Sequence, residues 1–106
     1  MFHKIKSINT LPNYKLDIKF KEGVTKIYDV SNLFNKNQIF KTLKDNESLF
    51  KSATIAKDGY GVIWNDDIDI SCNELWENGI NKTDNTKYLS NISLFNRLLT
   101  NHINHK

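Results

Sequence analysis

The chain has 106 residues, of which 39% are hydrophobic and 25% are charged. This length and balance are typical of one globular domain and exclude a wholly disordered chain. The formal net charge is +3, yet residues 58–79 hold six Asp and Glu residues and no Lys or Arg. This uneven distribution argues against a uniformly basic surface that would bind nucleic acid.

No segment has the composition of a membrane span or a secretory signal. Apolar runs fall far short of the ~18 residues that a span needs. The first ten residues alternate charged and apolar side chains, whereas a signal peptide needs a continuous apolar stretch. The single cysteine, Cys72, excludes an internal disulfide and suits a reducing compartment. We therefore expect a cytoplasmic protein that does not associate with a membrane.

The first predicted elements are strands. Residues 3–9 are expected to form an edge strand that turns at Pro12-Asn13. Residues 14–20 alternate strictly between apolar and charged side chains, and this period of two indicates a strand with one buried and one solvated face. The side chains expected to point outward are Lys15, Asp17 and Lys19.

The register of the return strand depends on the loop of this first hairpin. A two-residue loop at Glu22-Gly23 would pair Ile18 with Ile27 across the hairpin. Gly23 would supply the positive φ angle that such a turn requires. The buried face of the hairpin is then expected to consist of Leu16, Ile18, Phe20 and Ile27.

Short helical turns and a second hairpin are predicted in the middle of the chain. Ser31 and Asn37 are residue types that cap helices, and each precedes a short run of apolar residues. Residues 53–57 and 61–64 are predicted to pair across Asp58-Gly59, a dipeptide with a strong turn preference.

A further strand and a helix follow the second hairpin. Residues 68–70 predict a strand that buries its isoleucines and points its aspartate outward. Ser71 and Glu74 have the spacing of a capping box, in which each side chain bonds the other's backbone. The box predicts a helix that ends at Asn78-Gly79.

The last predicted element is an amphipathic helix. Residues 79–86 are polar and are expected to be a linker. Beyond them, apolar residues recur at helical spacing, and the stripe consists of Tyr88, Ile92, Phe95 and Leu99. The chain is thus expected to have a core domain, residues 1–79, and a linker with a C-terminal helix, residues 80–106. The predicted fold class is α+β, an antiparallel sheet of two hairpins plus a further strand, with short helices on one face.

The packing and turn residues of the core follow one another in a characteristic order. They are Leu16-x-Ile18-x-Phe20-x-x-Gly23, Asp29, Phe40-x-x-Leu43, Phe50, Val62-Ile63-Trp64-Asn65, Ile68-Asp69-Ile70 and Leu75-Trp76. This order and spacing resembles the domain of unknown function 2442 family over about residues 3–79. The resemblance implies a small bacterial α+β protein without established enzymatic activity. Some members of the family are encoded beside a second small protein in toxin–antitoxin-like pairs.

No residue pattern predicts catalysis, a cofactor or a metal site. Residues 65–71 begin like a calcium loop, but the sixth and twelfth positions of that loop lack the required Gly and Glu. Cys72 has no histidine near it in the sequence to act as a base. His102-x-x-His105 has helical ligand spacing but supplies only two ligands. We expect no enzymatic activity and no small-molecule ligand.

Two surfaces are candidates for binding. For a protein partner, a partly exposed tryptophan beside acidic side chains and the apolar helix stripe are the expected contacts; these residues are Trp76, Asp66, Asp67, Asp69, Tyr88, Ile92, Phe95 and Leu99. For nucleic acid, lysines on the outer face of the first hairpin could contact phosphates; these are Lys15, Lys19 and Lys26.

The leading hypothesis is a non-catalytic protein-interaction module, an antitoxin-like or regulatory member of a small bacterial gene pair. A stripe as apolar as that of the predicted C-terminal helix favours a protein partner or a homodimer. One alternative is a weak nucleic-acid-binding module that uses the lysine face. Another is an inhibitor from a mobile element that binds another protein through the acidic segment.

Overall fold

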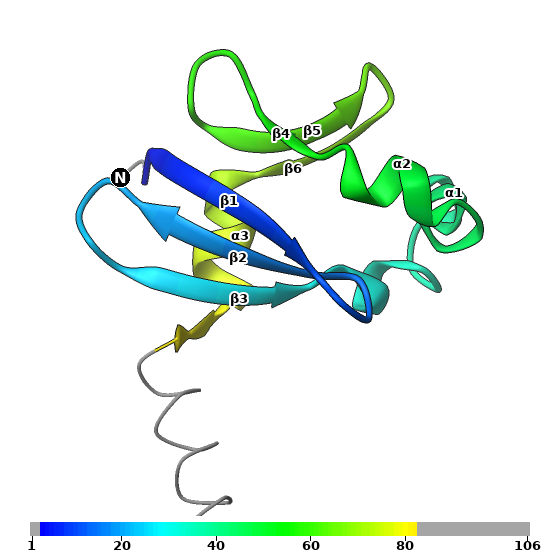
Figure 1. The fold of residues 1–106 in the computed structure, drawn as a ribbon, viewed down its shortest axis with the longest axis horizontal. Helices are drawn as coiled ribbons and strands as arrows, with labels where there is room; N and C mark the ends of the chain where they lie inside the picture. Colours follow the sequence, from blue (N-terminus) through cyan, green and yellow to red (C-terminus); the bar gives the residue numbers. More distant parts are fainter. Residues whose placement is uncertain (1–2, 83–106) are drawn as a thin grey trace, which may run out of the picture.

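The structure is a computed structural model, and it describes residues 3–82. The strands in this part of the chain form two antiparallel sheets (Figure 1). The four-stranded sheet has the order β1 (Ile5–Leu11), β2 (Lys15–Phe20), β3 (Thr25–Asp29) and β7 (Ile80–Asn81). The three-stranded sheet has the order β4 (Thr54–Ile55), β5 (Gly61–Asn65) and β6 (Ile68–Ser71).

Short helices connect the two sheets. The connection after β3 consists of η1 (Val30–Leu33), η2 (Gln38–Phe40), α1 (Lys41–Asp45) and α2 (Glu47–Lys51). In Figure 1, α1 and α2 lie together at one end of the molecule. The helix α3 (Cys72–Asn78) follows β6 and contacts β3, β5 and β6, so it joins the two sheets. The position of α3 against β3 determines where the candidate interaction surface lies.

One hydrophobic core lies between the sheets and the helices. The side chains of this core that have essentially no solvent exposure are Leu16, Ile18, Phe20, Val30, Leu43, Phe50, Val62 and Leu75. Trp64 also lies in the core, and its indole N–H donates a hydrogen bond to the carbonyl oxygen of Phe50 at 2.9 Å. No buried side-chain polar atom among the described residues lacks a hydrogen-bond partner. The core is therefore formed by apolar side chains, and the few polar side-chain atoms buried in it are hydrogen-bonded.

Several sequence predictions are confirmed. Along β2 the predicted face is buried, and Lys19 is exposed while Lys15 and Asp17 are partly exposed. The second hairpin pairs β4 with β5, and Gly59 in its turn has a φ of +86°. At the start of α3, the Ser71 side chain accepts a hydrogen bond from the Glu74 backbone N–H at 3.1 Å, as a helix cap does.

The predicted register of the first hairpin is wrong by one residue on the return strand. Ile18 pairs with Lys26 and Asp17 pairs with Ile27. The reason is a three-residue loop, in which the Phe20 N–H donates to the Val24 carbonyl oxygen and the Gly23 N–H donates to the Phe20 carbonyl oxygen. Gly23 has a φ of +97°, which is typical of a hairpin whose third loop residue is left-handed.

The extra loop residue exchanges the two faces of β3. Ile27, expected in the core, is partly exposed on the outer face of the sheet. Lys26 and Tyr28 instead share the core face with Ile18 and Leu16, their partners in β2. A one-residue change of register moves every side chain of a strand to the opposite face.

Three further expectations need correction. The strands form two sheets, not one, and residues 80–81 form β7 at the edge of β3, although a polar linker was expected there. Ile80 accounts for the extra strand β7, because its β-branched side chain lies opposite Ile27.

The cap of η1 also differs from the prediction. Asp29 accepts a hydrogen bond from the backbone N–H of Ser31, so the capping residue is Asp29 and not Ser31. The predicted helix with the stripe from Tyr88 to Leu99 lies outside the described residues.

Candidate interaction surface

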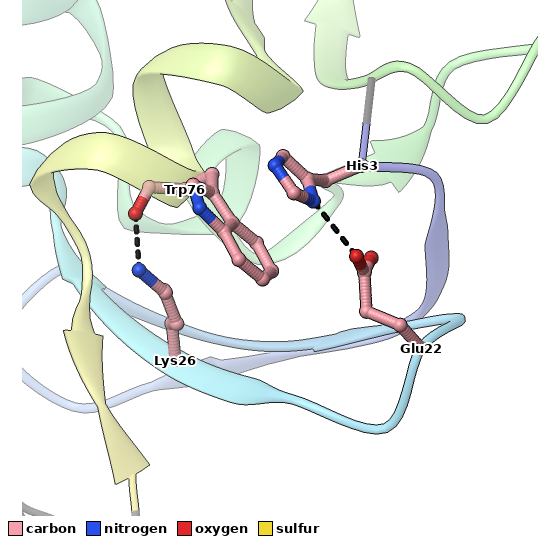
Figure 2. Close-up of polar contacts among 4 residues, drawn as sticks. All are labelled: His3, Glu22, Lys26 and Trp76. Carbon is pink, nitrogen blue, oxygen red and sulfur yellow. Dashed lines mark hydrogen bonds and ion pairs between the residues drawn. The ribbon is translucent and has the colours of Figure 1, made fainter. Parts of the chain in front are cut away.

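The strand β3 and the helix α3 are joined by two polar contacts. The Tyr28 hydroxyl donates a hydrogen bond to Glu74 Oε2 at 2.7 Å. The Lys26 ammonium donates to the carbonyl oxygen of Trp76 (Figure 2). Both contacts exist because the three-residue loop turns Lys26 and Tyr28 toward the core side, where α3 passes. Gly79 then lets the chain turn from α3 into β7, because a Cβ at that position would collide with the carbonyl oxygen of Leu75.

The predicted partner anchor, Trp76, is partly exposed but is held by its own chain. The His3 ring stacks on the indole with 3.5 Å between ring centroids and an interplanar angle of 1°. Lys26 Nζ lies 4.5 Å from the centre of the indole, and Figure 2 shows it on the side opposite His3. His3 Nδ1 lies 2.9 Å from Glu22 Oε2, which fixes the stacked ring. Whether Trp76 binds a partner stays a prediction.

The acidic side chains of the predicted partner site lie at the other end of β6. Asp66 and Asp67 are exposed in the turn between β5 and β6, and Asp69 is exposed on β6. The Asn65 side chain fixes this turn by accepting the backbone N–H groups of Asp67 and Ile68 at 2.9 and 3.0 Å. β6 leads from this turn to α3 (Figure 1), so its length separates Asp66 and Asp67 from the helix that carries Trp76. The structure does not bring these candidates together.

The predicted lysine face is also divided. Lys15 and Lys19 lie on the outer face of β2, but Lys26 lies on the opposite face of β3, which corrects the expected trio. Asp17 lies between the two outer lysines and forms an ion pair with Lys82 at 2.9 Å. The outer face of the sheet thus carries alternating charges instead of a continuous positive stripe.

A polar hollow of about 490 Å³ opens beside the contact between Tyr28 and Glu74. Its lining residues are Tyr28, Asn32, Leu33, Lys36, Glu74 and Asn78. Burial raises the pKa of the Tyr28 phenol above its usual value, and the hydrogen bond to Glu74 raises it further. Tyr28 therefore stays a proton donor at neutral pH, and Glu74 is the acceptor.

An apolar hollow of about 410 Å³ lies on the outer face of the four-stranded sheet. Its lining residues are Leu11, Lys15, Ile27, Asp29, Asn32, Asn78 and Ile80. Asn32 and Asn78 line both hollows, so the two hollows adjoin at the edge of β3. We call the joined surface the β3-edge groove. It combines three aliphatic side chains at one end with the carboxylate of Glu74 at the other.

Sequence reasoning missed most of this groove. A two-residue loop at Glu22-Gly23 predicts that Ile27 lies in the core. A three-residue loop with Gly23 in the left-handed region fits the same sequence and would have turned Ile27 outward. Ile80 stands alone among polar residues, so it gives no periodic signal, and only its pairing with Ile27 reveals its place.

One further residue considered in the sequence, Cys72, lies within the described part of the chain. Cys72 is buried at the first position of α3. Within residues 3–82 there is no group of three or more His, Cys, Asp or Glu side chains that could hold a metal ion. The helices of residues 3–82 also lack the length and hydropathy that a membrane-spanning helix needs. His102 and His105 lie outside the described part of the chain.

Comparison with known proteins gives one match. Residues 5–81 match the sequence profile of a family described as a protein of unknown function, DUF2442. The match includes every strand of both sheets and the helix α3. No curated protein and no solved structure matches the chain significantly.

Proposed function

The chain belongs to the DUF2442 family, whose function is unknown, and we propose that it is a non-catalytic protein-interaction module that binds its partner in the β3-edge groove. The observation that carries this proposal is the outer face of the four-stranded sheet. Ile80 is 58% exposed there, and it lines one hollow together with Ile27 and Leu11. Solvent-exposed apolar side chains that gather around a hollow are typical of sites where another protein binds.

The exposure of Ile80 is unusual within this chain. Within residues 3–82, the large hydrophobic side chains that count as exposed are Ile80 and Tyr60. Ile27 and Leu11 are partly exposed and lie outside the core cluster. Tyr60 is a different case, because the Lys4 ammonium lies 5.5 Å from the centre of its ring. Burial of one Ile side chain contributes about 1.5–3 kcal/mol, so covering Ile80 and Ile27 would contribute substantially to binding.

The antitoxin-like or regulatory role is a narrower form of this proposal. In this narrower form, the partner is the protein encoded by an adjacent gene. Co-purification of the two proteins, after expression from a common transcript, tests whether they bind each other. The nucleic-acid alternative has less support, because Lys26 contacts α3 and Asp17 lies between Lys15 and Lys19. The inhibitor alternative would use Asp66 and Asp67, which are exposed but have no apolar side chain of comparable exposure beside them in their turn.

Photo-crosslinking in the source cells tests the proposed surface. A photoreactive amino acid at position 80 should form a protein adduct, and Ile27→Asp in the same chain should abolish it by placing a charge in the groove. The matched control is the same amino acid at Thr54, which is exposed on the other sheet. Equal adducts at both positions, or an adduct at position 80 that survives Ile27→Asp, would contradict the proposal.

A further inference from the structure

We infer that the β3-edge groove is covered by the C-terminal segment of a second copy of this chain, so that two copies exchange residues 88–106. This inference rests on the proposed function and specifies its partner. It is carried by three features: the chemistry of the groove, the chemistry of the segment, and the direction in which β7 leaves the groove.

The groove has one carboxylate in each hollow, next to its apolar surface. Glu74 accepts a hydrogen bond from the neutral Tyr28 hydroxyl, and Asp29 accepts hydrogen bonds from the Ser31 backbone N–H and hydroxyl at 3.0 and 2.5 Å. Neither carboxylate forms an ion pair with another side chain within residues 3–82. Glu74 shares its hollow with Lys36, and Asp29 shares the apolar hollow with Lys15. Because no ion pair joins them, each carboxylate can still accept a cationic ligand. Leu11, Ile27 and Ile80 require an apolar ligand.

The C-terminal segment has the same two properties in its sequence. Residues 85–106 contain no Asp or Glu. The predicted apolar stripe from Tyr88 to Leu99 would be about 18 Å long as a helix. The same helical spacing continues to His102 and Lys106, which places basic residues at the end of the stripe. An apolar stripe that ends in basic side chains complements a groove in which aliphatic side chains lie beside the carboxylates of Asp29 and Glu74.

The direction of β7 favours a second copy over the chain's own segment. Ile80 pairs with Ile27 and Asn81 pairs with Lys26, so β7 runs toward Thr25 and away from Asp29. The ion pair between Lys82 and Asp17 holds the chain on this course. A return to its own groove would require a complete reversal within residues 83–87. In a two-fold dimer the segment could instead continue away from its own groove to that of the other copy, and each copy would give one segment and receive one.

Light scattering on full-length variants tests the exchange. The wild type should have twice the monomer mass, and both Ile80→Asp in the groove and Phe95→Asp in the stripe should be monomers. Asn81→Asp is the matched control, since it adds the same charge to the next residue of β7, on its other face, and should remain a dimer. Ile80 is mostly exposed, so Ile80→Asp should keep the thermal unfolding midpoint of the wild-type fold.

Mixing the two monomeric variants gives the decisive result. Ile80→Asp keeps an intact segment and Phe95→Asp keeps an intact groove, so an equimolar mixture should recover dimers through one native contact. A mixture that stays monomeric would overturn the exchange of segments. A wild type that is monomeric at several hundred micromolar would also overturn it, but would leave the groove open to another protein. A dimer that persists in Ile80→Asp would overturn both this inference and the proposed function of the groove.

Discussion

The two faces of the four-stranded sheet contain similar aliphatic side chains but differ in what covers them. On the core face Leu16, Ile18 and Phe20 have no solvent exposure. On the outer face Ile27 is partly exposed and Ile80 is mostly exposed. The core face gains its stability from burial. The outer face leaves the same kind of surface in contact with water, and this difference is the reason why we propose the outer face as the binding surface.

The two faces of the sheet also differ in how their polar groups are bonded. The core face carries Lys26 and Tyr28, and both are bonded to α3. The outer face carries charges that surround its aliphatic side chains, including the ion pair between Asp17 and Lys82. A face with satisfied polar groups and buried apolar groups is structurally complete. The outer face has exposed apolar groups inside a charged rim, which is the arrangement of an interface core and its rim.

Matched truncations of two isoleucines should show the largest difference between the faces. Ile18→Ala removes buried methyl groups and leaves a cavity, so it should lower the free energy of unfolding by about 2–5 kcal/mol. Ile27→Ala on the outer face should lower it by less than about 1 kcal/mol, because that side chain is partly exposed already. Urea unfolding at low protein concentration measures both values. Equal losses would show that the two faces are equally buried and would contradict the comparison.

A smaller effect is expected from the polar contact between β3 and α3. Tyr28→Phe removes the hydrogen bond to Glu74 and should lower the free energy of unfolding by about 1 kcal/mol at pH 7. The folded chain raises the pKa of Tyr28 through burial and Glu74. Below pH 10 both the folded and unfolded chains keep the phenol proton, so this contribution is constant. Above pH 10 only the folded chain keeps it, so stability falls as pH rises.

The pH dependence separates Tyr28 from the other titrating groups. Above pH 10 the wild type should lose up to about 1.4 kcal/mol per pH unit relative to Tyr28→Phe. Stability measured by urea unfolding between pH 9 and 11 provides the comparison. Parallel curves for the two proteins would show that the phenol of Tyr28 titrates alike in the folded and unfolded chains.

The sequence predicts the core face well because its signals are local. The alternation in residues 14–20, the turn at Asp58-Gly59 and the cap at Ser71 each depend on neighbouring residues, and the structure confirms all three. Of the predicted capping box, only the Ser71 half forms, because the Glu74 side chain bonds Tyr28 instead. The α+β class follows from these elements. The family resemblance is confirmed over residues 5–81.

The outer face was not predictable in the same way because its signals are not local. Whether Ile27 is buried depends on one residue in a loop, and a sequence that contains Glu22-Gly23 is compatible with loops of two or three residues. The place of Ile80 depends on a pairing across more than fifty residues. Division of the strands into two sheets likewise depends on how β1 and β4 meet in space. The candidate groove therefore appears only in the folded chain.

Solvent accessibility of isoleucine methyl groups tests the central claim most directly. A soluble paramagnetic probe should broaden the NMR signals of exposed methyl groups and leave buried ones unchanged. In the concentrated wild type we expect the methyl groups of Ile27 and Ile80 to be as protected as those of Ile18. In Phe95→Asp, we expect Ile27 and Ile80 to become exposed while Ile18 stays protected. Strong broadening of Ile27 and Ile80 in the concentrated wild type would contradict the account that another copy covers the outer face.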